Sequence, residues 1–122
     1  MTIRDVQEIL EAKVLVGGDR MDGPVDTACG SDLMSDVLAF VKDKTVLITG
    51  LINPHVVRTS EMLDITCIVF ARGKLPNQEM LEMAEENGIT VLATEMTTYT
   101  ACGELYIHGL PGTKKRLGKE GG

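Results

Sequence analysis

The stretch from Thr45 to Gly73, "TVLITGLINPHVVRTSEMLDITCIVFARG", decides the fold. It opens and closes with apolar runs, "TVLIT" and "ITCIVFA", that are rich in β-branched residues and lack alternation with polar ones. Such runs are typical of strands covered on both faces, as in a parallel sheet. Between them, Asn53 is a favoured helix N-cap and Pro54 a favoured first helical residue. The stretch therefore predicts two strands joined by a helix in a right-handed crossover.

The segments on either side extend this pattern. Downstream, "ITVLATEM" (89–96) predicts another buried strand, and the helix before it ends at Asn87-Gly88. Upstream, "KVLVGG" (13–18) and "VDTAC" (25–29) predict two short strands. The remaining expected helices are one capped by Thr2 with Asp5, one capped by Ser31 or Asp32 with an apolar stripe of Leu33, Val37, Leu38 and Val41, one around 80–86 and one near 98–109.

The resulting order, α-β-β-α-β-α-β-α-β-α, predicts a three-layer α/β/α sandwich with a mostly parallel central sheet. The pattern leaves open which edge the first two strands take and in which direction they run. We expect a single domain over residues 1–110 and a flexible basic tail over 111–122.

Composition and charge narrow the class of protein. The 122 residues are 43% hydrophobic and 25% charged, which is ordinary for one globular domain. The net charge is −6, but four basic and one acidic residue in the last ten leave residues 1–112 at −9. That acidity, with two Phe, two Tyr and no Trp, argues against nucleic-acid binding. The tail is either a solvated terminus or a contact for an acidic partner.

The three cysteines, Cys29, Cys67 and Cys102, are widely spaced and form no zinc or iron–sulfur motif, so we expect no metal and no cofactor. Cys67 lies in an apolar run and is expected to be a buried thiol. Neither a leader nor an apolar run of about 18 residues is evident. We therefore expect no membrane contact, a cytoplasmic location and reduced thiols.

A ligand site is expected where parallel strands end, because loops and helix N-termini converge there. His55 and Arg58 share a face at a helix start, where an anion would be attracted by the helix dipole, imidazole and guanidinium together. The alternative is that Arg58 pairs with Glu61 and His55 is solvated. Arg72 is equally consistent with a phosphate contact or a loop charge. The predicted ligand-binding residues are Thr49, Gly50, Asn53, His55, Arg58, Arg72, Gly73 and Thr94.

Catalytic patterns are sparse in this sequence. Gly17-Gly18 and Gly50 fit neither the Walker spacing nor G-x-G-x-x-G, and no serine has a G-x-S-x-G context. His108 is interpreted as a helix-terminus charge, and Glu82, Glu85 and Glu86 as a solvated helix face. We therefore expect no catalytic residues and no enzyme activity.

The runs "MSDVLAFV", "TVLITG" and "CIVFARGKLPNQEMLEMAEENGITVLATEMTTYTACGELY" resemble the DRTGG domain, over nearly the whole chain up to about His108. That domain is similar to the amino-terminal domain of HPr kinase. The family's strand ends typically read "GDR" and "TGG". Here they are Gly50-Leu51-Ile52 and Ala71-Arg72-Gly73, so the first and last glycines remain.

The resemblance implies a non-catalytic regulatory module that forms a homodimer and accompanies adenine-nucleotide sensing. The "SEMLDITCIVFARGK" segment is similar to stand-alone members found near iron-only hydrogenase components. It implies, as an alternative, an accessory subunit with a redox-complex partner protein. Met21, Met34 and Met96 are expected either to be exposed and cover a partner or to fill the core.

Overall fold

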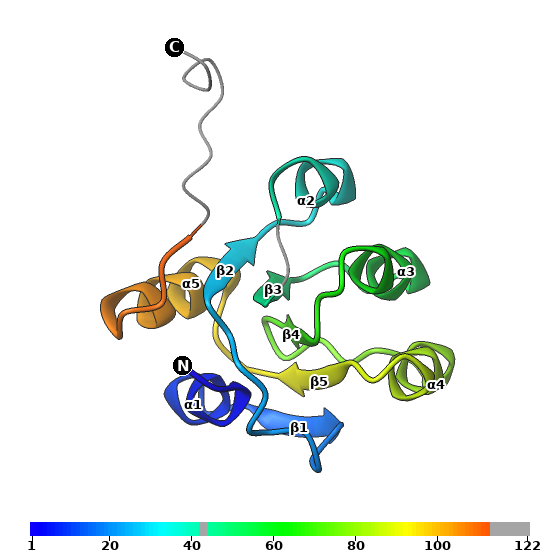
Figure 1. The fold of residues 1–122 in the computed structure, drawn as a ribbon, viewed down its shortest axis with the longest axis horizontal. Coiled ribbons are helices and arrows are strands. Elements are labelled where there is room, and N and C mark those ends of the chain that lie inside the picture. The colour runs from blue at the N-terminus through cyan, green and yellow to red at the C-terminus, as the bar shows by residue number, and fades with distance from the viewer. Residues whose placement is uncertain (42–43, 113–122) are drawn as a thin grey trace.

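A five-stranded sheet lies between two layers of helices in the computed structural model, which describes residues 1–41 and 44–112 (Figure 1). The expected α/β/α sandwich is therefore confirmed, and so is the order of its elements. The helices are α1 (Ile3–Ile9), α2 (Met34–Phe40), α3 (Pro54–Met62), α4 (Gln78–Glu86) and α5 (Thr98–Ile107). The strands are β1 (Lys13–Val16), β2 (Thr27–Gly30), β3 (Thr45–Thr49), β4 (Cys67–Phe70) and β5 (Thr90–Ala93).

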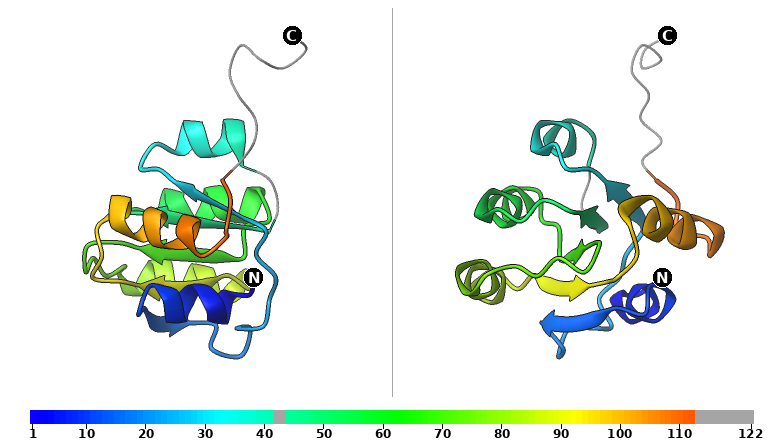
Figure 2. Two further views of the ribbon diagram at one scale, coloured as in Figure 1. Left: turned by 90° about the vertical axis from the view of Figure 1, so that its left-hand side faces the viewer. Right: turned by 180° about the vertical axis from the view of Figure 1, so that it is seen from behind.

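The sheet order is β1-β5-β4-β3-β2, and its two edges are the strands that the sequence left unplaced. β2, β3, β4 and β5 pair in parallel, whereas β1 runs antiparallel to β5 with a bulge between Val14 and Val16. The carboxyl ends of the four parallel strands therefore lie along one end of the sheet. Figure 2 shows the same arrangement from the side and from behind.

Three helices cover one face of the sheet and two cover the other. α2, α3 and α4 pack side by side on the first face, and α1 and α5 lie together on the second (Figure 1). Every residue of β3, β4 and β5 is buried, which explains the absence of alternation in their sequences. Leu47, Ile68 and Phe70 point to the three-helix side, and Val46, Ile48 and Val69 to the two-helix side.

Side-chain caps fix most helix starts. Thr2 and Asp5 form a full capping box at the start of α1, where the sequence predicted an incomplete one because Asp takes the place of Glu. Asn53 caps α3 through a bond from the His55 N–H to its side chain, and Asn77 and Thr97 cap α4 and α5 in the same way. Because each cap is local in sequence, these helices start where their sequences indicate.

The prediction for α2 is wrong in its cap and in two of its four stripe residues, Leu33 and Leu38, while Val37 and Val41 do pack against the core. The N-cap is Leu33, without a side-chain hydrogen bond, and the helix begins at Met34. Met34 and Val37 face the core, while Leu33 is 58% exposed and Leu38 is also exposed. The physical reason is that Ser31 bonds the Leu33 backbone in a turn, which delays the helix.

Two methionines proposed as exposed partner contacts are instead core residues. Met21 and Met34 are buried, and Met96 is half-buried against the two-helix core. Of the two readings offered for them, core filling is the one that the structure supports. The exposed methionine of α3, Met62, was not singled out from sequence.

The chain continues past α5 along the edge of the sheet. The Ala28 N–H of β2 donates to the Pro111 carbonyl, and Leu110 is buried. Residues 113–122, which hold most of the predicted basic tail, lie outside the described residues. No helix in the described part of the chain is long and apolar enough to cross a membrane.

Candidate functional site

The site predicted at the strand ends centres on Arg72, which follows β4. Its backbone is left-handed, with φ of +61°, a conformation that costs an ordinary L-residue roughly 1–2 kcal/mol. The Arg72 N–H donates to the Met96 carbonyl at 2.7 Å, and the Gly73 N–H donates to the Thr94 carbonyl at 2.9 Å. These bonds tie the turn after β4 to the segment after β5, so the strained conformation is held by its neighbours.

The Arg72 guanidinium lies directly over Gly50 at the end of β3. A Cβ atom on Gly50 would stand 2.7 Å from Arg72 Nη2 and 3.1 Å from Nε, so the guanidinium would have to move to admit it. Glycine at this position therefore makes room for the guanidinium. Arg72 is exposed, and within residues 1–41 and 44–112 no carboxylate or carbonyl bonds its guanidinium. Its five donors are available to a ligand.

A carboxylate stands on the other side of this turn. Glu95 lies over Gly73, whose φ is +68°, and a Cβ there would be 2.6 Å from Glu95 Oε2. The turn thus has an exposed cation on the side of Gly50 and an exposed anion on the side of Gly73. A group with acceptors at one end and hydroxyl or amino donors at the other would match this pair.

Asp32, after β2, organises the neighbouring strand end and was not among the predicted site residues. Its Oδ1 accepts from the Thr49 hydroxyl at 2.9 Å and from the Gly50 N–H at 2.8 Å. The Thr49 hydroxyl in turn accepts from the Leu51 N–H at 3.1 Å. Both groups that the sequence offered to a ligand at this strand are engaged by the protein itself.

Thr94 is likewise fully engaged. It is buried, its hydroxyl donates to the Leu10 carbonyl at 2.8 Å, and its carbonyl accepts from Gly73. Thr94 therefore anchors the end of β5 to α1 and holds the Arg72-Gly73 turn in place.

The remaining predicted residues lie at the start of α3. The Asn53 side chain accepts from the His55 N–H at 2.8 Å, while His55 and Arg58 are exposed. The alternative pairing of Arg58 with Glu61 does not form among the described residues. The structure thus brings Gly50, Arg72, Gly73 and Thr94 into contact and places Asn53, His55 and Arg58 on the adjoining helix, without a contact to Arg72.

The arrangement lacks the features of a metal or thiol centre. Among the described residues, no three His, Cys, Asp or Glu side chains gather as metal ligands would. Burial raises the pKa of the Cys67 thiol to about 12, and it raises the pKa of Cys29 and Cys102 as well. His108 caps the end of α5, with its Nδ1 2.7 Å from the Glu104 carbonyl.

Two comparisons with known proteins bear on this geometry. The family model for the DRTGG domain matches residues 5–106. A solved structure, described as the CBS and DRTGG domains of the regulatory region of Clostridium perfringens pyrophosphatase complexed with its activator, diadenosine tetraphosphate, is similar with a TM-score of 0.70 at 20% identity. The match covers 95% of this chain and 51% of that one, so the chain spans about half the length of its structural neighbour. No curated protein sequence matches the chain.

Proposed function

The chain belongs to the DRTGG domain family, and we propose that it is a dimeric, non-catalytic regulatory domain that senses a small anionic ligand of the nucleotide type. The ligand would bind at the carboxyl ends of the parallel strands, over the turn formed by Arg72 and Gly73. The observation that carries the proposal is the Arg72 guanidinium, exposed, unpaired among the described residues and held in a strained backbone conformation.

Strain at an exposed arginine supports a role for its side chain. At a left-handed position, glycine has the lowest conformational free-energy cost. The backbone conformation therefore does not explain why arginine stands at position 72. The guanidinium lies over Gly50, at the end of β3. An exposed guanidinium without a partner among the described residues is suited to bidentate recognition of phosphate.

Glu95 supports a nucleotide over a simple anion. Inorganic phosphate has few hydrogen-bond donors for a carboxylate, whereas the ribose hydroxyls or an adenine amino group can donate hydrogen bonds to it. At the start of the neighbouring helix, Arg58 adds positive charge for the far phosphates of a longer ligand, and His55 is exposed beside it. The activator-bound regulatory region of the structural neighbour is consistent with this class of ligand.

Calorimetry and thermal shift test the proposal, with AMP, ATP, diadenosine tetraphosphate and inorganic phosphate as probes. A ligand at one hundred times its Kd should stabilise the wild type by about 2.7 kcal/mol. Arg72→Ala should lower this gain to about 0.4–1.4 kcal/mol, and Arg58→Ala should lower it less. Arg4→Ala is the matched control, because Arg4, on α1, is exposed and pairs with Asp22 of the loop after β1, away from the strand ends. If none of the probes stabilises the wild type, the ligand proposal is wrong.

A second candidate is an accessory subunit that binds a redox-complex protein at the same end of the sheet. The observation that favours it is the exposure of Leu33 and Leu75, which follow β2 and β4 at the carboxyl ends of these strands. Protein interfaces commonly combine an apolar centre with a polar rim. Pull-down from a native extract checks this candidate, and recovery of this chain alone would count against it.

A further inference from the structure

Helix α5 is apolar on its outer side as well as on its buried side. Ala101 and Leu105 face the core, whereas Tyr99, Tyr106 and Ile107 are 89%, 71% and 73% exposed. Tyr99, Gly103 and Tyr106 are spaced by four and three residues, so they form one stripe along the helix. A surface helix of a monomer normally turns polar residues outward, and this stripe departs from that rule.

Gly103 lies in the middle of the stripe and leaves it open. A Cβ atom there would meet no other atom within 4 Å, so nothing in the monomer requires glycine at this place. Glycine in a helix interior costs roughly 0.5–1 kcal/mol relative to alanine. Its presence is explained if another helix approaches the α5 backbone closely.

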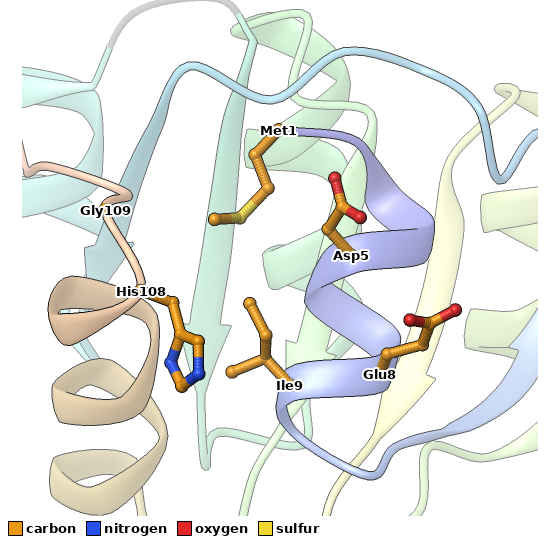
Figure 3. A pocket seen from close by; sticks show the side chains of 6 residues that line it. All are labelled: Met1, Asp5, Glu8, Ile9, His108 and Gly109. Atoms are coloured by element: carbon orange, nitrogen blue, oxygen red, sulfur yellow. The ribbon is translucent and has the colours of Figure 1, made fainter.

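A hollow of about 460 Å³ adjoins the end of this stripe, between α1 and α5 (Figure 3). Ile9 of α1 and His108 at the end of α5 point toward each other across it, and the Met1 side chain lies beside them. The same face of the molecule therefore carries protruding side chains, Tyr106 and Ile107, and a recess next to them. A two-fold contact places the protrusions of each copy at the recess of the other.

We propose that the outer face of α5, with the adjoining hollow, is the surface through which two copies of this chain associate. This inference deepens the dimeric part of the proposed function and names the partner surface. Two tyrosines can bury 150–250 Å² each, so with Ile107 the stripe supplies roughly 400–600 Å² per copy. Two copies then reach the roughly 1,000 Å² that a specific interface needs, before the rim of the hollow is counted.

The charge distribution favours a second copy at this face. Residues 1–112 carry a net charge of −9, so two copies repel one another over most of their surfaces. From Thr98 to Ile107 the single charged residue is Glu104, which is half-buried and lies 3.9 Å from His108. The α5 stripe is thus nearly free of like charge, and the acidic residues of the proposed surface are Asp5 and Glu8 in the lining of the adjoining hollow.

Light scattering on the full chain, with sedimentation equilibrium across a range of concentrations, tests the proposal. The wild type should have twice the 13.2 kDa mass of one chain, and both Tyr106→Glu and Ile107→Glu should lower it to 13.2 kDa. Met62→Glu on α3 is the matched control, because Met62 is 72% exposed, as Ile107 is, and should leave the mass doubled. Circular dichroism checks that each variant is folded.

Two results would overturn the proposal: a wild type of 13.2 kDa at every concentration, or a dimer that survives both glutamate substitutions in folded protein. Should a variant fail to fold, amide exchange on the wild type decides, since α5 should gain protection as the protein is concentrated. Unchanged protection of α5 would contradict the interface. Calorimetry on Ile107→Glu with ATP reports the strand-end site separately, so a failed dimer and a failed ligand site are distinguishable.

Discussion

Replacing Arg72 by glycine should stabilise the protein while it weakens ligand binding. With φ at +61°, arginine costs roughly 1–2 kcal/mol at this position, and glycine does not. Glycine also makes the unfolded chain more flexible, which offsets about 0.4–1 kcal/mol of that gain. The guanidinium is exposed and unpaired among the described residues, so little else is lost. The net expectation is an increase of about 0.5–1 kcal/mol in the free energy of unfolding.

Urea and thermal unfolding measure this change. For a domain of this length the melting temperature should rise by roughly 2–4 °C. Asp64→Gly is the matched control: Asp64 is also left-handed, with φ of +56°, and lies between α3 and the start of β4, at the opposite end of the parallel strands. Both variants should gain stability, but only Arg72→Gly should lose affinity for ATP, by about tenfold to a hundredfold, since a charged hydrogen bond is worth about 1.5–3 kcal/mol.

Two results would contradict this expectation. If Arg72→Gly loses stability while Asp64→Gly gains it, the Arg72 side chain stabilises the fold, and the strain is explained without a ligand. If Arg72→Gly keeps full affinity for ATP, the guanidinium is no part of a binding site.

Three further predictions follow from single contacts. Asp32→Ala should cost about 1–3 kcal/mol of unfolding free energy, because two partners at the end of β3 lose their acceptor, whereas the exposed Asp22→Ala should cost under about 0.5 kcal/mol in the same urea titrations. Gly30→Ala should cost about 1–3 kcal/mol, because its Cβ would overlap Cys102 Sγ, and a double-mutant cycle with Cys102→Ala should recover most of it; additive effects would refute this contact. Burial raises the pKa of Cys67 from 9.0 to about 12, so the unfolded state releases this proton first as pH rises, and stability contributed by the neutral thiol is lost between about pH 9 and 12. The decline should be on the order of 1 kcal/mol per pH unit steeper in the wild type than in Cys67→Ala, and equal slopes would contradict it.

The elements that the sequence predicted well are those determined by neighbouring residues. The strands around Val46, Ile68 and Val91 have no alternation because helices cover both sides, a property visible in the apolar runs themselves. The start of α1 at Thr2 and of α3 at Asn53 depends on hydrogen bonds that span two or three residues. Such bonds can be recognised without knowing the fold.

The features that escaped prediction depend on partners far along the chain. Asp32 looks like a helix cap in the sequence. Its carboxylate instead accepts hydrogen bonds from Thr49 and Gly50, 17 and 18 residues later, at the end of the adjacent strand β3. The apolar stripe of α2 shifted for the same reason, since the helix starts after that turn. The left-handed backbone of Arg72 is held by a hydrogen bond to Met96, which lies 24 residues later. The residues around Arg72 do not indicate this conformation by themselves, but the glycines of the family motif at this position do.

The contacts at the strand ends also determine which groups remain available to a ligand. Groups that appeared free in the sequence, the Thr49 hydroxyl and the Gly50 N–H, are satisfied within the protein, which leaves the Arg72 turn as the exposed charge. The candidate ligand set therefore contracts from eight residues to a centre at Arg72, with Gly50 and Gly73 shaping it and Glu95 added beside it.

The most direct measurement of the central claim is a titration of isotope-labelled protein with ATP, followed by amide chemical shifts. We predict saturable shifts concentrated at Gly50, Arg72, Gly73 and Glu95, with the same residues unmoved in Arg72→Gly. An absence of saturable shifts, or shifts confined to other parts of the described structure such as α5, would contradict the claim that the strand ends bind a nucleotide.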